Sequence, residues 1–116
     1  MTDRSLGSVK VANEVIAHIA SLTTSQVQGI VGMYPAGSRD GHRLLPSNTS
    51  HKGVRVEMGN DTLNIDLFVI VDHSAHVPTV AAEVQRQVAD AIDKMLGLEV
   101  RQVNVFVGDV RFPEDA

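Results

Sequence analysis

Two histidines and an aspartate lie within one short stretch of the chain, Asp72-His73-Ser74-Ala75-His76. Imidazole nitrogens and carboxylate oxygens are common ligands of zinc and other transition metals, so His73 and His76 are the natural candidates for a metal site. Such a site needs further ligands, and the sequence offers neither a third one at a recognised spacing nor a His-Glu-x-x-His frame. We therefore expect a solvated turn here and no bound cofactor.

Other residue types that could catalyse a reaction are present, but their spacing does not support catalysis. Serines, histidines and aspartates occur in no nucleophile-elbow frame, so a Ser-His-Asp triad has no support. His18 is expected on the rim of a helix. Glu57 and Asp66 are expected on one face of neighbouring strands, where paired carboxylates could act as acid and base. Because Arg55 lies beside them, we favour a solvated ion-pair face and predict that the protein is not an enzyme.

One glycine pair resembles a nucleic-acid-binding motif. Gly29 and Gly32 form a G-x-x-G sequence, which in KH modules clamps a phosphate backbone between two helices with the help of basic residues. Here the two middle residues are apolar and no basic residue adjoins the motif. A short strand or extended connection is the better interpretation of residues 27–34.

Residues 35–52 form the obvious loop, because they are rich in Pro, Gly, Ser and Asn and have no sustained periodicity. The loop carries Arg39, Arg43 and Lys52 against a single acid, and a loop of this length is either functional or mobile. A nucleic-acid-binding or anion-binding module that uses the basic loop 39–55 is therefore the alternative function. The net charge of −4 argues against nucleic acid as the partner.

Composition indicates a single globular domain. The chain has 116 residues, of which 43% are hydrophobic and 21% charged, so we expect one domain over 1–116 with short tails at 1–7 and 111–116. It contains no cysteine, which fits a reducing compartment. The first residues have no apolar signal region, and no apolar run approaches the roughly 18 residues that span a bilayer. We expect a cytoplasmic protein that does not insert into the membrane directly.

Hydrophobic spacing predicts two helices. Residues 13–25 follow helical periodicity, with Asn13 as a plausible N-cap. A second helix is expected over 78–96, because Pro78 suits its first turn and Gly97 suits its end. The apolar stripe of this second helix consists of Val77, Val80, Ala81, Val84, Val88, Ala91, Ile92 and Met95.

Alternation of apolar and polar residues predicts the strands. A short strand is expected at 8–11, and longer ones at 53–58, 62–71 and 100–107, in addition to the short segment within 27–34. Gly59-Asn60-Asp61 is a turn that makes a hairpin of the second and third of these. Two sets of residues are expected to point inward: Leu63, Ile65, Leu67, Val69 and Val71 in the strand at 62–71, and Val103, Val105 and Val107 in the last strand. The fold class is therefore α+β, with two helices on one face of a small mixed sheet, related to the ferredoxin-like plan.

The face of the sheet that the helices leave uncovered is the predicted partner-binding surface. Its outward residues are polar in one half and apolar in the other, a combination that suits self-assembly or docking beside exposed strand edges. The predicted surface consists of Arg55, Glu57, Asn64, Asp66, Phe68, Asn104 and Phe106.

Six segments follow one another along the chain in this order: G-S-V-K-V-A-N-E-V-I-A-H-I-A, V-Q-G-I-V-G-M, K-G-V-R-V-E-M-G, L-N-I-D-L-F-V-I-V, V-P-T-V-A-A-E-V-Q-R-Q-V-A-D-A-I and M-L-G-L-E-V-R-Q-V-N-V-F-V. Over about Gly7 to Val110, this ordered set resembles the alkaline shock protein family of envelope stress response proteins. Two departures are visible. Ala12 stands where the family commonly has a serine helix cap, and the loop 35–52 is longer and more basic than usual.

The resemblance implies a bacterial, cytoplasmic, non-enzymatic protein of envelope stress response and cell-envelope homeostasis. It also implies that the protein forms homo-oligomers and associates with related family members. One of these is a membrane-anchored partner that holds it at the inner face of the cell membrane. The family has no defined catalytic or ligand residues, so the resemblance transfers none to this chain.

Overall fold

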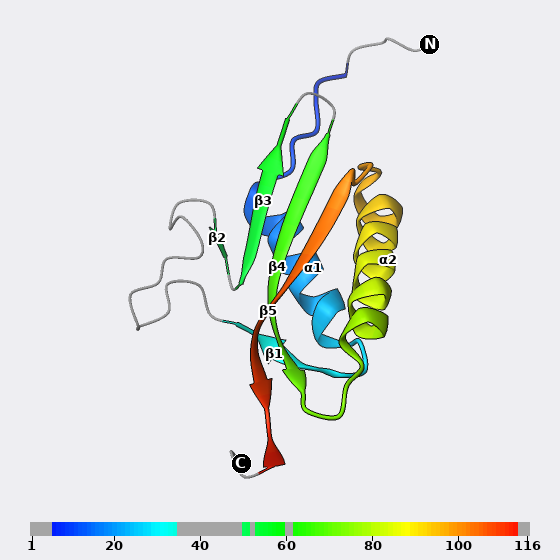
Figure 1. Cartoon of the computed structure of the whole chain (residues 1–116). Helices are drawn as coiled ribbons and strands as arrows, with labels where there is room; N and C mark the ends of the chain where they lie inside the picture. The colour runs from blue at the N-terminus through cyan, green and yellow to red at the C-terminus, as the bar shows by residue number, and fades with distance from the viewer. Residues whose placement is uncertain (1–5, 35–49, 52, 60–61, 114–116) are drawn as a thin grey trace.

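The computed structural model describes residues 6–34, 50–51, 53–59 and 62–113. The elements in these ranges are α1 (Asn13–Ser25), β1 (Ile30–Met33), β2 (Ser50–His51), β3 (Val54–Met58), β4 (Leu63–Asp72), α2 (Val77–Leu96) and β5 (Gln102–Arg111). Both helices lie on one face of a five-stranded mixed sheet, which confirms the predicted α+β class (Figure 1). Within the described ranges, no helix has the length and apolar character that crossing a membrane requires.

β4 is the centre of the sheet. β5 runs parallel along the whole of one edge of β4, whereas β1 and β3 both pair with β4 in the antiparallel direction. β1 and β3 share the other edge end to end and meet at Phe68. The N–H of Phe68 donates to the carbonyl of Gly53 at 2.8 Å, and its own carbonyl accepts from the N–H of Tyr34 at 2.7 Å. Since both groups of one strand residue point to the same edge, β1 and β3 must lie along a single edge of β4.

The junction between β1 and β3 requires glycine. Gly53 has φ +80°, and a Cβ there would lie 2.7 Å from the carbonyl oxygen of Tyr34 and 3.1 Å from that of Phe68. Residues that carry a side chain rarely adopt this backbone conformation, and a backbone oxygen at that distance cannot move away to make room for a methyl group. The hairpin of β3 and β4 was predicted, and its pairing from Val54–Leu67 to Met58–Leu63 confirms it.

The helices begin and end largely as predicted. In α2, Pro78 lies in the first turn, and Gly97 ends the helix in the left-handed conformation, with its N–H donating to the carbonyl of Asp93 at 2.8 Å. In α1 the prediction of Asn13 as N-cap is wrong. Ala12 is the N-cap residue, with an extended backbone whose carbonyl accepts from the N–H of Val15 at 3.0 Å, and no side chain caps the helix.

The core fills the space between the helices and the inner face of the sheet. Nearly all of its largest buried side chains are aliphatic, and the residues that contribute most are Ile16, Leu63, Ile65, Leu67, Val54, Val69, Val71, Val84, Val88 and Ile92. Four of the eight residues in the predicted stripe of α2 are buried, at i, i+4, i+8 and i+12 from Val80. The inner-face prediction for β4 is confirmed in full.

The predicted strand at 8–11 does not exist, because these residues lie outside any strand and Val9 is 93% exposed. Without an N-terminal strand, β4 and β5 lie side by side and are not separated as in the split ferredoxin-like plan. β5 is also longer than expected and reaches Arg111, inside the predicted tail. A bulge lets it continue, because Val107 pairs with Val69 and Asp109 with Ile70, which leaves Gly108 unpaired.

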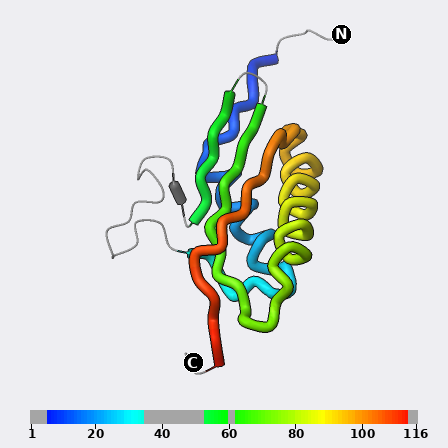
Figure 2. The backbone as a smooth tube through the Cα atoms, viewed as in Figure 1, coloured from blue at the N-terminus to red at the C-terminus, as the bar shows by residue number. Residues whose placement is uncertain are grey.

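Three residues predicted to face the core are exposed. Val107 is 39% exposed, Met95 68% and Val77 38%. The last part of β5 runs past both helices, as Figure 2 shows, so no helix covers the strand there. The two helix residues lie in the first and last turns of α2. The apolar pattern therefore indicates burial only where helix and sheet overlap.

Candidate partner-binding surface

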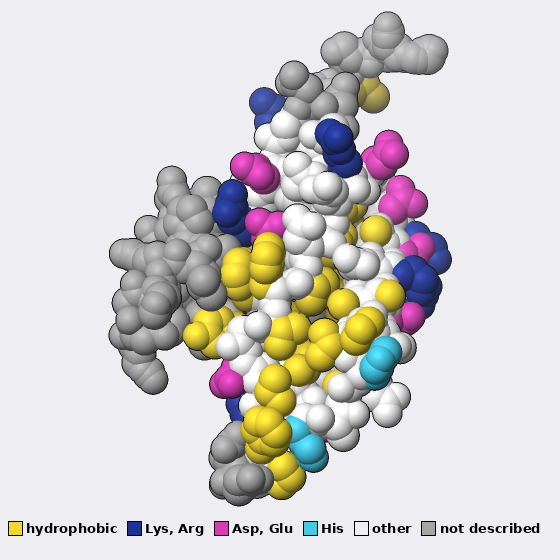
Figure 3. Space-filling view, in the orientation of Figure 1, with side chains coloured by type: hydrophobic (Ala, Val, Ile, Leu, Met, Phe, Trp, Pro, Cys, Tyr) yellow, Lys and Arg dark blue, Asp and Glu magenta, His cyan; other side chains and the backbone are white. Residues whose placement is uncertain are grey.

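The structure brings the seven predicted surface residues onto one face. Arg55 lies opposite Asp66, and Asp66 opposite Asn104; Phe68 lies opposite Phe106. Because these positions alternate with the buried residues of β3, β4 and β5, their side chains lie on the face turned away from the helices. Figure 3 shows that face, with hydrophobic side chains in a band across its middle and lower part. We call it the outer face, and its members are Arg55, Glu57, Asn64, Asp66, Phe68, Asn104 and Phe106.

The polar half of the outer face is a connected network around Asp66. The amide of Asn104 donates to Asp66 Oδ1 at 2.8 Å. Arg55 Nε lies 3.8 Å from Asp66 Oδ2, and Arg55 Nη2 lies 3.7 Å from Glu57 Oε2. The guanidinium therefore lies between the two carboxylates and within ion-pairing distance of both, as predicted for this face.

The apolar half of the outer face is an aromatic pair. The rings of Phe68 and Phe106 stack with centroids 4.8 Å apart and an interplanar angle of 20°. Phe106 is 46% exposed, but Phe68 is only 6% exposed. Phe68 therefore supports Phe106 from below and offers little area of its own to a partner.

Asn64 plays a more internal part than predicted. Its Oδ1 atom is buried and accepts no hydrogen bond. An unpaired buried acceptor costs about 1–3 kcal/mol of stability. A partner cannot reach that atom, although Asn64 as a whole is partly exposed, as Arg55, Asp66 and Asn104 also are.

Sequence reasoning missed Tyr34 as a member of the outer face. Met33 lies opposite Val69, so Tyr34 comes opposite Phe68 and on the same face. Its ring reaches Gly108 in β5, where a Cβ would lie 2.6 Å from Tyr34 Cγ. The place of Tyr34 depends on the pairing of β1 with β4, and no pattern among neighbouring residues indicates that pairing.

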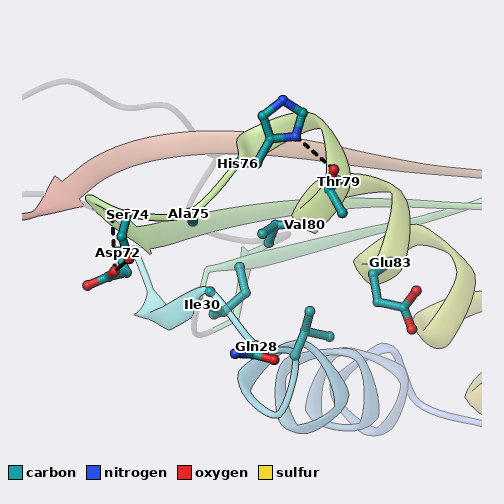
Figure 4. Close-up of a pocket in the computed structure, with 11 residues that line it drawn as sticks. Gln28, Ile30, Asp72, Ser74, Ala75, His76, Thr79, Val80 and Glu83 are labelled. Atoms are coloured by element: carbon teal, nitrogen blue, oxygen red, sulfur yellow. Dashed lines mark hydrogen bonds between the residues drawn. The ribbon is translucent and has the colours of Figure 1, made fainter.

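A cavity of about 550 Å³ forms a second candidate site, at the end of the molecule where α2 begins. Figure 4 shows its walls, which come from the connection between α1 and β1, the end of β4 and the first turns of α2. It is lined by Val27, Gln28, Gly29, Ile30, Asp72, Ser74, Ala75, His76, Thr79, Val80 and Glu83.

The polar side chains of this cavity are mostly paired with one another or with their neighbours. Asp72 accepts hydrogen bonds from the hydroxyl and the N–H of Ser74, which lower the pKa of its carboxyl group. His76 Nδ1 lies 2.7 Å from Thr79 Oγ1. A hydrogen bond from Arg86, and to a smaller extent one from Gln87, lowers the pKa of Glu83. The cavity therefore presents few unpaired groups that could orient a ligand.

The predicted metal candidates separate in the structure. His76 lines the cavity, whereas the ring of His73 lies against Phe112, with centroids 5.8 Å apart. Among the described residues, no three His, Cys, Asp or Glu side chains come together in a way that could hold a metal ion.

The nucleic-acid candidates also separate. Gly32 lies inside β1, and Gly29 has φ +101° in a turn where a Cβ would lie 2.7 Å from Val80 Cγ2. The G-x-x-G sequence is therefore not a loop between two helices, and the KH interpretation is excluded. Arg39, Arg43 and Lys52 of the basic loop lie outside the described residues.

Comparisons with known proteins agree on one family. The family model of alkaline shock protein 23, described by a cell envelope-related function, matches residues 1–112. The uncharacterized protein YloU of Bacillus subtilis (strain 168) is 33% identical over 107 residues, which is 90% of this chain and 89% of that protein. A stress response regulator gls24 homolog of Streptococcus pyogenes serotype M1 is 28% identical over 117 residues, which is 98% of this chain and 64% of that protein.

The fold is similar to that of a solved MamM-CTD structure. The TM-score is 0.50 at 15% sequence identity, and the alignment covers 84% of this chain and 99% of that chain. At this identity the similarity concerns the fold alone.

Proposed function

Because the chain belongs to the alkaline shock protein 23 family, we propose that it is a non-enzymatic interaction and assembly protein of the bacterial envelope stress response. The similarity to stress response regulators supports the stress role. In this proposal the protein acts at the cytoplasmic side of the cell membrane. There it binds copies of itself and related family members, one of which is anchored in the membrane.

The observation that carries the proposal is the uncovered outer face. Both helices lie on the opposite side of the sheet, and the outer face joins a charged network to a half-exposed aromatic ring. Aromatic residues surrounded by polar groups are typical of the centres of protein interfaces. Phe106 is the residue that we expect to anchor a partner.

The charged residues of the outer face would contribute specificity more than affinity. Arg55 and Glu57 are 31% and 65% exposed, and exposed ion pairs are worth about 0–1 kcal/mol. Charges at the rim of an interface instead steer the encounter and reject partners of the wrong charge. We therefore expect changes at Arg55 or Glu57 to slow association, and changes at Phe106 to speed dissociation.

The absence of an enzymatic role is proposed from the chemistry of the two polar sites. On the outer face, Arg55 lies within ion-pairing distance of both carboxylates. In the cavity, Ser74 donates to Asp72, and His76 contacts Thr79, so serine and histidine do not meet as nucleophile and base. Among these described residues the contacts do not form a Ser-His-Asp triad, in which histidine binds the serine hydroxyl.

The test is affinity purification of the tagged chain from its native host, followed by mass spectrometry. We expect a membrane protein of the same family to co-purify together with untagged copies of this chain. Recovery of the chain alone, under mild detergent and across expression levels, would contradict the proposal.

A pair of matched double variants tests the outer face itself. Asp66→Arg with Phe106→Ala should lower the oligomer mass in light scattering and reduce recovery of the membrane partner. The control makes one identical and one comparable change on α2, as Asp90→Arg with Met95→Ala, where Met95 is an exposed apolar residue at 68%. An unchanged mass for the first variant, with circular dichroism showing an intact fold, would mean that this face is not the interface.

A further inference from the structure

β5 is an edge strand whose outer edge is only partly covered. It pairs with β4 along one side, and in the described part of the chain no strand pairs with its other side. Exposed strand edges present unpaired N–H and C=O groups that can bind another strand. The question is which of these groups are already satisfied within the molecule.

The direction of each β5 backbone group follows from β4. Phe68 points both its N–H and its C=O toward β1 and β3, so the odd-numbered residues of β4 point theirs toward β5. In the register that pairs Leu67 with Val105, the even-numbered residues of β5 face β4 up to the bulge. Val103, Val105 and Val107 therefore point their backbone groups outward.

Two side chains form hydrogen bonds with backbone groups at the two ends of this outer edge. Gln85 of α2 donates from Nε2 to the carbonyl of Val103 at 3.0 Å, which agrees with the outward direction of that carbonyl. After the bulge, Arg111 faces β4, because its carbonyl accepts from the N–H of His73 at 3.0 Å. Val110 therefore points outward, and its N–H donates to Asp109 Oδ1 at 2.8 Å.

Between these two ends the edge is open. Within the described residues, no hydrogen bond reaches the outward N–H and C=O of Val105 or Val107. The side chains agree, since Phe106 is 46% and Val107 39% exposed. The open stretch is symmetric about Phe106, with one outward-facing residue on each side.

We propose that this open stretch pairs in antiparallel fashion with the same stretch of a second copy, on a two-fold axis at Phe106. Val105 of each copy lies opposite Val107 of the other, and each pair exchanges both of its backbone hydrogen bonds. The two sheets then form one continuous sheet. This inference rests on the proposed self-association and specifies the contact that produces it.

Neighbouring registers satisfy fewer groups. An axis at Val105 would bring Val107 opposite Val103, whose carbonyl already accepts from Gln85. An axis at Val107 would bring Val105 opposite Asp109, whose backbone faces β4. Only the axis at Phe106 pairs Val105 with Val107 and also leaves the end contacts made by Gln85 and Asp109 undisturbed.

The same axis accounts for the exposed aromatic ring. Phe106 and its copy become a directly opposed pair without hydrogen bonds, the type of pair in which side chains approach most closely. Each ring already stacks on Phe68, so the contact extends a row of stacked rings across the outer face. A second copy is the partner favoured by these observations, because a single two-fold axis pairs both open residues and also brings the exposed Phe106 opposite its own copy.

Single cysteines test the register, since the chain contains no native cysteine. At Phe106 the two Cα atoms are expected about 4.5 Å apart, within the range that a disulfide accepts. Phe106→Cys removes the aromatic contact and weakens the dimer, but it keeps the backbone pairing of Val105 and Val107, so mild oxidation should still trap a covalent dimer. The control is Gln102→Cys on the same strand and face, whose copy would lie roughly 26 Å away along the strand, from eight residues at about 3.3 Å each.

The outward N–H of Val105 offers a second test that removes no hydrogen bond to β4. Val105→Pro removes a donor that does not pair with β4, whereas Val105→Thr keeps the donor and nearly the same shape. By sedimentation, the proline variant should lose the dimer, and the threonine variant should resemble the parent protein. Circular dichroism and the melting temperature of each variant report whether it is folded.

Three results would overturn the inference: equal cross-linking at positions 102 and 106, a folded Val105→Pro variant that still dimerises, or a parent protein that stays monomeric up to millimolar concentration. A strand of another protein found cross-linked to position 106 would replace the second copy as the occupant. These outcomes differ from failure of the proposed function, which shows as the absence of family partners in the purification from the host.

Discussion

Arg55 determines what the carboxylates of the outer face can do. It lies within 3.8 Å of Asp66 and 3.7 Å of Glu57, so both acids have a cationic neighbour. Asp66 has a further donor in Asn104, at 2.8 Å. The pair that the sequence offered as a conceivable acid and base is therefore part of a surface network.

The contact between Ser74 and Asp72 gives a prediction at the wall of the cavity. Ser74→Ala should raise the pKa of Asp72 toward its ordinary value, because the Ser74 hydroxyl is the main cause of its lowering. Two-dimensional NMR titration of the Asp72 side chain measures the change. Ser25→Ala is the control, since the Ser25 hydroxyl donates to the carbonyl of Ser21, far along the chain from Asp72.

The sign of the pH effect follows from that lowered pKa. A carboxyl group whose folded pKa lies below its unfolded pKa stabilises the fold above the unfolded pKa, and this contribution is lost as the pH falls through the folded pKa. The parent protein should therefore lose more stability than Ser74→Ala on acidification below about pH 4. Equal losses in both proteins would show that the contact does not persist in solution.

Gly53 gives a prediction at the junction of β1 and β3. Gly53→Ala should destabilise the fold by at least about 2 kcal/mol, because it adds a contact with a backbone oxygen to the strain of a left-handed conformation. Gly97→Ala is the matched control, since its φ is +70° but a Cβ there meets nothing within 4 Å. Urea unfolding of the two variants separates the contact from the strain, and equal losses would refute the contact.

Some parts of the helices and strands form the core, and other parts remain exposed for contact with a partner. α2 buries Val80, Val84, Val88 and Ile92 against the sheet and uses Gln85 to cover part of the β5 edge. β5 contributes Val103 to the core and then continues past the helices, where Phe106 and Val107 are exposed. Val103 and Val110 of the strand therefore contribute to the fold, and the stretch around Phe106 between them is available for contact.

Two positions three residues apart on α2 test this division. Ile92→Ala should cost about 2–5 kcal/mol, since Ile92 is fully buried and the vacated volume cannot be filled. Met95→Ala, at a site 68% exposed, should change stability by less than about 0.5 kcal/mol. Chemical denaturation measures both, and a small effect at Ile92 would contradict its place in the core.

The whole molecule carries a net charge of −4, which bears on the alternative function. Nucleic-acid binding depends on neutralising phosphates with cationic side chains, and its strength falls steeply with salt. On the described surface, Arg55 pairs with Asp66, Arg86 with Glu83, and Lys94 with Asp90. The remaining candidates for that function are the cations of the basic loop together with the exposed Lys10, Arg101 and Arg111.

Fluorescence anisotropy with a labelled single-stranded oligonucleotide tests this alternative. We expect no binding at 150 mM salt with protein up to about 100 μM, a range in which non-specific binders are typically detected. If binding appears, falls with salt and disappears when Arg39, Arg43 and Lys52 are replaced by glutamine, the loop module is the correct function. The same replacements should leave the oligomer mass unchanged if the outer face and the β5 edge mediate assembly.

Local patterns in the sequence determined the helices, the hairpin, the inner face of β4 and the seven outer-face residues of β3, β4 and β5. Each depends on periodicities of a few residues, which fix the direction of a side chain relative to its own backbone. The false strand at 8–11 and the false cap at Asn13 occurred at the start of the chain, where short segments carry too few residues for a reliable pattern.

The tertiary structure alone decided what depends on pairing between distant segments. It placed β1 and β3 on one edge of β4, brought Tyr34 beside Gly108, and extended β5 through a bulge to Arg111. It also decided that Phe68 is covered while Phe106 is not, and that Gln85 and Asp109 leave an open edge between them. Sequence periodicity specifies which way a side chain points, but the groups that surround it come from segments far along the chain, and only folding brings these together.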